Sequence, residues 1–424
     1  MQHIITILIA ILIFGLIIGI HEFGHFIVAK LNHIQVNQFA IGMGPKLIHF
    51  QKGETEYSLR LFPIGGFCAM EGEDQSSDNP NAFEKKAVWR RMTVVLAGAF
   101  MNLVLGFLLI AILLCTAQKV PSLTIAKFAE TTNSAGNTVT ASESERSGLQ
   151  IGDKIVAIDG SHIFSTTDLI YKLQTTDTDT YDITVKRDGS RVTIENVTFH
   201  NDNTGGLLDF SVEGKSKNPV NVITYAAKDT VATAKLIWMS LIELVSGKYS
   251  LQDLSGPVGT VSVIEQAAST GENLLERVQS VMNLTIFITV NVGVFNLLPI
   301  PGLDGSRFVF LLIEAIRRKP ISKNREAMVH FIGMAALFLL TAGGFPAQVL
   351  QCPLLTDDLA GLFKDVVKLL HDFVLLSYHA NRRLHTCCIS SFAFIGAMST
   401  ETAAFFGSTV SVARMGANGL LLLW

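Results

Sequence analysis

The sequence predicts a polytopic α-helical membrane protein with about four transmembrane helices, a membrane-associated β-hairpin and an inserted α+β domain outside the membrane. Two observations carry this prediction. Of the 424 residues, 49% are hydrophobic and only 16% are charged, whereas a soluble globular protein has about 25% charged residues. The apolar residues also fall into long runs, and a polar stretch at residues 120–213 separates the second run from the third. The apolar excess therefore belongs in a bilayer.

Charge and cysteine content argue against other classes of protein. A net charge of −3 gives no electrostatic reason to expect nucleic acid as a partner. The five cysteines include no C-x-x-C pair and do not form the even set of a disulfide framework. We therefore expect chemistry that does not use sulfur.

Residues 1–118 are expected to hold the first two transmembrane helices. The first apolar run extends from Ile4 to Ile20 and continues to Ala29, which is long enough to span a bilayer. A cleavable signal peptide is the alternative, but the run lacks a basic start and a small-residue cleavage site. The second run extends from Met92 to Ala117.

Basic residues predict the topology. Lysines and arginines cluster at 85–91, before the second run, and at 317–325, after a third run from Val281 to Leu298. Such clusters mark cytoplasmic loops. Both clusters give the same arrangement, with the N-terminus and residues 120–280 outside the cytoplasm and residues 30–91 and 303–325 inside.

The last transmembrane region, residues 281–350, is less regular. Its fourth run, Met328 to Leu340, has 13 residues and reaches only about 20 Å as a helix, against a hydrocarbon core of about 30 Å. A full span would need residues 341–350, which contain helix-weakening glycines and a proline. We expect residues 214–280 to form an amphipathic connecting region. No role can be assigned to the tail at 351–424.

The loop between the first two helices predicts a β-hairpin. Lys46 to Phe50 and Tyr57 to Leu61 are short apolar or alternating runs on either side of a Lys-Gly-Glu turn. The following residues, Phe62 to Phe67, are too apolar for an ordinary loop. The hairpin either dips into the bilayer with its edge covered by protein or lies on the surface.

The inserted region, residues 120–213, is rich in short β-type runs and polar turns. Its string Ser147 to Ile155, followed by Ile158-Asp159-Gly160, resembles the signature of a PDZ domain, although Ser147 stands where alanine is usual. A PDZ domain binds a peptide by adding it as a strand to a sheet edge. The resemblance therefore implies an extracytoplasmic PDZ-like domain with a peptide ligand.

The motif His21-Glu22-Phe23-Gly24-His25 interrupts the first apolar run. On a helix, two histidines four residues apart share one face and can bind one zinc ion, with Glu22 beside them as general base. A lone histidine would more often be a hydrogen-bonded core residue. Ionisable residues inside a span are costly, however, and they are functional by default. The motif therefore predicts a metal site.

A catalytic zinc takes three protein ligands and keeps one position for water. The best candidate for the third ligand is Asp304, because residues 296–305 break the third helix with two prolines and two glycines. A broken helix at membrane depth is tolerated only against protein or a water-filled cavity. A protease that works inside a bilayer needs such a cavity.

With these motifs the chain resembles the site-2 proteases, which are intramembrane zinc metalloproteases, and in particular the bacterial branch that acts on membrane-anchored anti-sigma factors. The resemblance rests on the motif at 21–25, on Asn296 to Gly305 with its N-x-x-P-x-P-x-L-D-G spacing, on the PDZ-like insert, and on Gly98 and Asn102, which match a G-x-x-x-N element.

This resemblance implies the role of each site residue. His21, His25 and Asp304 would bind Zn²⁺, and Glu22 would activate the attacking water. Asn296 would hold substrate or stabilise the oxyanion, and Asn102 would help to position the substrate. The hairpin at 42–70 would lie against the site and present the substrate as a strand.

The resemblance also implies a multi-pass protein of the bacterial plasma membrane. Its function would be regulated intramembrane proteolysis of single-span substrates, of the anti-sigma factor type or the signal and leader peptide type. Its partners would be these substrates, the lipid bilayer and a peptide ligand of the PDZ-like domain, without nucleic acid.

Two other functions remain open at this point. A PDZ-bearing membrane scaffold with an inactive metal site would bind peptides without cleaving them, but it leaves the joint presence of Glu22 and Asp304 unexplained. A metal transporter would predict more histidines and acids on the other helices, and the second helix offers only Asn102.

The resemblance ends near Leu340, and Thr341 to Trp424 match no pattern that we recognise. One hypothesis is that a fusion or a shifted reading frame replaced the original ending of the chain. The intact mass of the natively expressed protein tests this hypothesis, because a mass that corresponds to all 424 residues would contradict the processing and reading-frame version.

Overall fold

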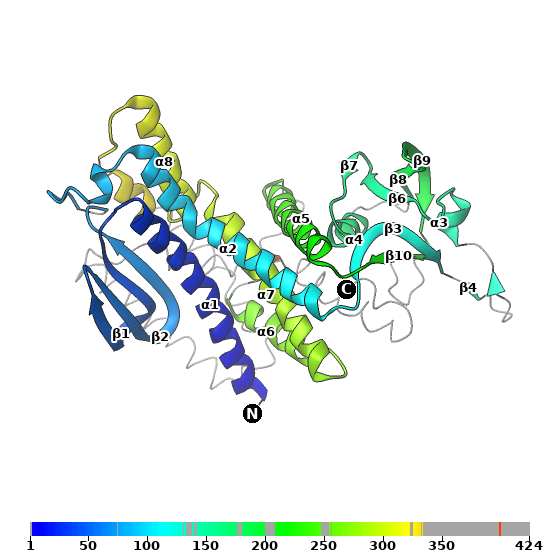
Figure 1. Cartoon of the computed structure of the whole chain (residues 1–424), viewed down its shortest axis with the longest axis horizontal. Helices are drawn as coiled ribbons and strands as arrows, with labels where there is room; N and C mark the ends of the chain where they lie inside the picture. The colour runs from blue at the N-terminus through cyan, green and yellow to red at the C-terminus, as the bar shows by residue number, and fades with distance from the viewer. Residues whose placement is uncertain are drawn as a thin grey trace. The chain divides into compact units, whose positions relative to one another are not determined.

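The computed structural model describes most of the chain up to residue 333 (Figure 1). The described residues are 2–73, 75–129, 131–132, 138–139, 142–175, 180–199, 208–246, 254–255, 257–322, 325–331, 333 and 398–399. The chain divides into two compact units. The first comprises Met1–Leu105, Gly247–Ala268 and Ile288–Thr400, and the second comprises Gly106–Ser246, Ser269–Phe287 and Glu401–Trp424.

Three described helices are long and apolar enough to cross a membrane, which identifies a multi-pass membrane protein and agrees with the first three predicted spans. They are α1 (Gln2–Leu31), α2 (Val88–Thr116) and α7 (Leu274–Asn296). Helix α7 begins seven residues before the predicted start, because the apolar Leu274, Leu275 and Val278 already continue the helical pattern. Most of the predicted fourth span lies outside the described residues, which show helix at 325–331.

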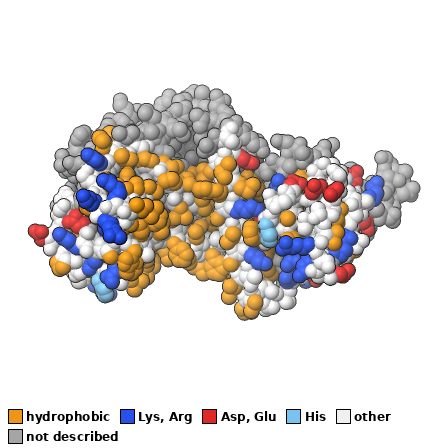
Figure 2. All heavy atoms as spheres, turned by 90° about the horizontal axis from the view of Figure 1, so that it is seen from above, with side chains coloured by type: hydrophobic (Ala, Val, Ile, Leu, Met, Phe, Trp, Pro, Cys, Tyr) orange, Lys and Arg blue, Asp and Glu red, His pale blue; other side chains and the backbone are white. Residues whose placement is uncertain are grey.

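The outer faces of these helices are apolar. On α1, Leu8 and Leu12 lie one turn apart and are 60% and 69% exposed. On α2, Phe100, Leu108 and Ile112 are also exposed. Figure 2 shows apolar side chains gathered over a broad area of one face. An exposed apolar area of this kind is typical of a surface that contacts lipid.

The predicted hairpin is present in the first unit. Strands β1 (Val36–Lys52) and β2 (Thr55–Met70) flank a tight turn with Gly53 at φ 62°. The hairpin begins six residues before the expected start at Gly42. Both strands bend, so that residues 38–41 pair with 66–69 on one side and with 56–59 on the other. Residues 66–70 therefore run beside residues 36–41 near helix α1 (Figure 1).

Helix α8 (Asp304–Arg317) starts directly at Asp304 and is fixed to its neighbours in the first unit by ion pairs. Arg91 of α2 donates to both carboxylate oxygens of Glu314, with the shorter distance at 2.6 Å. Arg307 pairs with Glu73, which follows the end of β2. An apolar cluster that includes Val36, Val94 and Leu311 also joins α1, α2, the hairpin and α8. Asp304 therefore stands on a firmly held helix.

The second unit contains the inserted domain. Its six-stranded sheet has the order β10-β3-β6-β8-β9, with β7 paired to β6. The strands are β3 (Val120–Phe128), β6 (Lys154–Ile158), β7 (Ser161–His162), β8 (Thr180–Arg187), β9 (Ser190–Thr198) and β10 (Phe210–Lys215). They include the short β-type runs expected from the sequence. Helices α3 (Glu143–Arg146) and α4 (Thr166–Thr175) belong to this unit, and its apolar core contains Leu149, Ile155 and Leu169.

Two of the remaining described helices lie in the connecting region. Helix α5 (Pro219–Val245) packs on α4 within the second unit, and α6 (Pro257–Ser269) belongs mainly to the first unit. The short elements are η1 (Phe83–Lys85), β4 (Thr131–Thr132) paired with β5 (Thr138–Val139), and β11 (Leu254–Ser255) paired with β12 (Met398–Ser399).

Candidate metal centre

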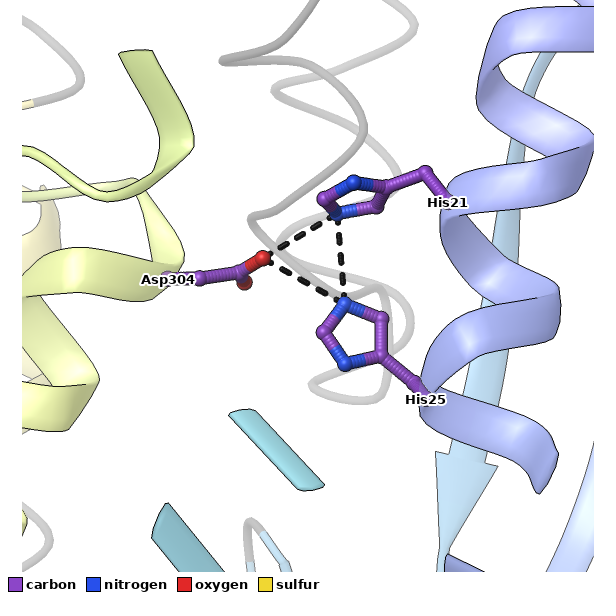
Figure 3. A group of neighbouring side chains, drawn as sticks. All are labelled: His21, His25 and Asp304. Atoms are coloured by element: carbon purple, nitrogen blue, oxygen red, sulfur yellow. Dashed lines mark hydrogen bonds and ion pairs between the residues drawn. The ribbon is translucent and has the colours of Figure 1, made fainter. Parts of the chain in front are cut away.

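Three buried side chains converge in the first unit, His21 and His25 from α1 and Asp304 from the start of α8 (Figure 3). The histidines are four residues apart, so both imidazoles leave the same face of α1. The two Nε2 atoms are 3.2 Å apart, and Asp304 Oδ2 lies 3.0 Å from His21 Nε2 and 3.3 Å from His25 Nε2. The three atoms thus form a nearly regular triangle.

The size of this triangle fits a zinc ion. A tetrahedral zinc with nitrogen and oxygen ligands at about 2.0–2.1 Å keeps neighbouring donor atoms about 3.3 Å apart. The three measured separations, 3.0 to 3.3 Å, are close to that edge length. Two imidazoles and one carboxylate are also a donor set that zinc accepts in catalytic sites. The residues present therefore fit the metal in both distance and chemistry.

Helix α2 closes one side of the triangle with a glycine. A Cβ atom on Gly98 would lie 2.3 Å from His25 Nε2 and 2.8 Å from His21 Nε2. Any larger residue would therefore push the imidazole nitrogens out of place. Gly98 is the first residue of the G-x-x-x-N element, and its lack of a side chain leaves room for the two donor nitrogens.

The same helix orients both imidazoles. His25 Nδ1 donates to the Val94 carbonyl at 2.8 Å, which leaves Nε2 as the nitrogen with a lone pair for a metal. Asn102 is fully buried, and its side-chain amide lies 3.3 Å from His21 Nδ1. A metal at His21 Nε2 requires a proton on Nδ1. The amide oxygen of Asn102 accepts a hydrogen bond from this N–H once the amide is turned by 180°.

Asp304 reaches the histidines because α7 ends at Asn296 and α8 starts only eight residues later. The connecting loop is tight. A Cβ on Gly305 would lie 2.2 Å from the Leu298 carbonyl oxygen, so only glycine fits there, and Gly302 has φ 100°. The glycines predicted to break the third helix are thus required by the loop that delivers Asp304.

Glu22, the predicted general base, is buried next to the hairpin. A Cβ on Gly66 of β2 would lie 3.2 Å from Glu22 Cγ and 2.9 Å from the Ala40 carbonyl oxygen. The backbone of β2 therefore passes directly beside the side chain of Glu22. Asn296 is also buried, at the last position of α7. Among the described residues it forms no side-chain hydrogen bond with the three converging residues.

The sequence pointed to all three converging residues and to Asn102, which lies against one of them. It did not reveal the Val94 carbonyl or the contact between Gly66 and Glu22. The first is a backbone group that any residue could supply, so the sequence carries no signal for it. For the second, a run with two consecutive glycines, Gly65 and Gly66, was the only available hint.

Comparisons with known proteins show the family to which this chain belongs. The model of peptidase family M50 matches residues 9–340. A protein of Clostridium acetobutylicum whose name describes a zinc metalloprotease is 36% identical over 341 residues, which cover 79% of this chain and 94% of that protein. The regulator of sigma-W protease RasP of Bacillus subtilis is 31% identical over 420 residues, which cover 79% of this chain and 96% of RasP.

These matches confirm the resemblance stated from the motifs, and the family match ends at residue 340, where that resemblance ended. They also identify Zn²⁺ as the cofactor, because the relatives are named as zinc metalloproteases. The chain belongs to peptidase family M50, the site-2 proteases, and is a membrane-embedded zinc metalloprotease.

Proposed function

We propose that His21, His25 and Asp304 are the zinc ligands of this protease and that Glu22 is its general base. The observation that carries the proposal is the donor triangle of 3.0 to 3.3 Å, which matches one face of a zinc tetrahedron. The glycine at position 98 supports it further, because a side chain there would fill the space beside both Nε2 atoms.

The bound zinc would polarise the scissile carbonyl and lower the pKa of water at the fourth position towards about 7. Glu22 takes a proton from the attacking water and later delivers it to the nitrogen of the leaving amine. Asn296 donates a hydrogen bond to the oxygen on which negative charge develops. Asn102 keeps His21 in the tautomer that presents Nε2, in addition to its predicted role in positioning the substrate.

The substrate binds as an added β-strand along the hairpin. The stretch at 66–70 lies beside Glu22 through Gly66, and it pairs with residues 36–41 at an edge of the hairpin. An edge of this kind offers backbone donors and acceptors to an extended peptide. A transmembrane helix must unwind before its peptide bonds can be cleaved, and strand addition holds it in the unwound form.

We infer that the substrates are single-span membrane proteins or leader peptides. An active site among membrane-spanning helices favours peptide bonds that lie in or beside the bilayer. The RasP relative is named as a regulator of sigma-W. This name supports a substrate of the anti-sigma factor type, cleaved in regulated intramembrane proteolysis.

The proposal also includes an arrangement of the chain in the membrane. Residues 1–118 and 281–350 carry the spanning helices, four in all if the region after 328 completes the last one. Residues 120–213 form a PDZ-like domain outside the cytoplasm that binds a peptide, and residues 214–280 connect it to α7. The basic clusters at 85–91 and 317–325 support this orientation, with the N-terminus also outside the cytoplasm.

The test is cleavage of a model single-span substrate by purified protein reconstituted in lipid. In Glu22→Gln the side chain keeps its size but cannot accept the proton, so we expect cleavage to fall by about 10²–10⁴-fold while bound zinc is retained. Glu195→Gln, the same change at an exposed position of β9, is the matched control and keeps the wild-type rate. Equal cleavage by Glu22→Gln and wild type would contradict the general-base assignment.

A further inference from the structure

We propose that His330 is a positioning residue for Asp304, because its ring holds the loop that delivers this carboxylate to the metal site. The inference rests on the proposed ligand set. His330 lies in the helical segment at 325–331, and its side chain is buried. The Gly302 backbone N–H donates to His330 Nδ1 at 2.9 Å. Gly302 is only two residues before Asp304.

The ring of His330 also contacts helix α8. Ser306 Oγ lies 3.5 Å from the same Nδ1 atom and donates to the Leu303 carbonyl at 2.8 Å. The ring of Phe310 meets the imidazole edge to face, with centroids 5.6 Å apart. Ser306 and Phe310 both belong to α8, so His330 joins the loop and the helix that together carry Asp304.

A second contact with this loop comes from Gly333, three residues after His330. A Cβ on Gly333 would lie 2.1 Å from Pro301 Cβ and 2.9 Å from the Pro301 carbonyl oxygen. His330 and Gly333 therefore contact neighbouring residues of the loop. Gly333 allows the backbone to come close enough, and His330 then supplies the hydrogen-bond acceptor. Pro301 and Gly302 are adjacent, so both contacts act on the same point of the loop.

This acceptor is needed because the Gly302 N–H is buried. The backbone at Gly302 is left-handed, with φ 100°, and its N–H donates to the His330 ring from within the loop between α7 and α8. A buried N–H without an acceptor is unfavourable, and the loop would shift to find one. Metal ligands must keep their distances within about 0.2 Å, so a small shift of Asp304 would weaken zinc binding.

Zinc affinity is therefore the readout. Substitution of groups that orient metal ligands commonly weakens affinity 10–100-fold. His330→Asn and His330→Leu are a matched pair, because the two side chains have nearly the same shape and only asparagine carries an acceptor atom near the place of Nδ1. In a chelator competition with the full-length protein, we expect His330→Leu to lose about 10-fold or more and His330→Asn to stay within about 3-fold of wild type.

Two further measurements keep the result interpretable. Cobalt substitution reports the coordination geometry, and we expect the visible spectrum of His330→Leu to differ from those of wild type and His330→Asn. Gly333→Ala forces a methyl group against Pro301, and we expect it to weaken zinc binding in the same direction. It tests the loop contact even if His330→Leu does not fold.

The outcomes separate this inference from the proposed function. If Asp304→Ala binds zinc as tightly as wild type, the ligand set itself is wrong. If Asp304→Ala loses zinc but His330→Leu binds it normally, the ligand set stands and the positioning role of His330 is overturned. Equal losses in His330→Asn and His330→Leu would also overturn it, because the acceptor would then make no difference.

Discussion

Two buried aspartates, one in each unit, have very different partners. Asp153 of the inserted domain accepts from Arg187 Nε at 2.7 Å, from Arg187 Nη2 at 2.6 Å and from the Gln150 backbone N–H at 2.9 Å. Asp304 faces two imidazole nitrogens that also face each other. Arginine is a permanent cation, whereas a neutral imidazole presents a lone pair.

We propose that this difference distinguishes a structural carboxylate from one that binds a metal. The charge of Asp153 is neutralised by a side chain of the same domain, so this carboxylate does not need a bound cation. Around Asp304, all three converging atoms are of the kind that bind a cation, and a zinc ion at their centre would neutralise the carboxylate. Burial alone would not separate the two residues, because each is at most 2% exposed.

The largest expected effect is the loss of zinc in Asp304→Ala. We expect this variant to purify without stoichiometric zinc and to cleave a model single-span substrate at the background rate, because two imidazoles alone do not make a three-ligand site. Metal analysis and cleavage in lipid measure the two losses. Wild type treated with a chelator should regain activity when zinc is added, while Asp304→Ala should not. Normal zinc content in Asp304→Ala would contradict the assignment.

In contrast to Asp304→Ala, Arg187→Gln should lower the stability of the protein without changing its zinc content. It leaves the buried Asp153 carboxylate without its cation, so we expect a loss of about 2–3 kcal/mol in the stability of the inserted domain. This is below the usual cost for a fully buried pair because 25% of the Arg187 side chain is exposed. Thermal unfolding measures the loss, and zinc content should not change. Arg191→Gln, on the exposed face of β9, is the control and should unfold like wild type.

Substitution of a third buried carboxylate, Asp229 of α5, should have the smallest effect on stability, and this effect should depend on pH. Burial and the nearby Asp168 raise its pKa, although hydrogen bonds from Ser165 and Thr167 partly oppose this. The charged form is thus the costly one in the folded protein. Stability falls as pH rises from the unfolded pKa through the higher folded pKa, and the penalty is complete above the folded value.

Asp229→Asn removes this penalty. We expect a gain on the order of 1 kcal/mol at neutral pH, which shrinks as pH falls through the folded pKa and disappears below about pH 3, where the wild-type carboxyl is protonated in both states. Thermal unfolding at several pH values measures it. A variant that is less stable than wild type at neutral pH would show that the charged form of Asp229 is favourable.

Much of the site could be predicted from the sequence because the site residues belong to recognisable patterns in the chain. The spacing of His21 and His25 fixes their common helix face, and the prolines and glycines before Asp304 mark the break that delivers it. The contacts that orient these residues leave little trace. The Val94 carbonyl is a backbone group, and His330 looks like an isolated histidine until the fold brings it to Gly302.

Some features of the fold could also be predicted from the sequence, and others could not. Apolar runs long enough for a bilayer predicted α1, α2 and α7, and short β-type runs predicted strands β3, β6, β8 and β9 of the inserted domain but not β7 or β10. The double pairing of residues 38–41 in the hairpin depends on where the two long strands bend, and hydrophobic periodicity does not encode it. The extent of a fourth span lies beyond the described residues.

X-ray absorption at the zinc edge of the purified wild-type protein tests the central claim most directly. The account predicts one zinc per chain, bound by two imidazole nitrogens and by oxygen ligands, all at about 2.0–2.2 Å. A sulfur ligand at about 2.3 Å, or a spectrum with fewer than two imidazoles, would contradict a site built from His21, His25 and Asp304.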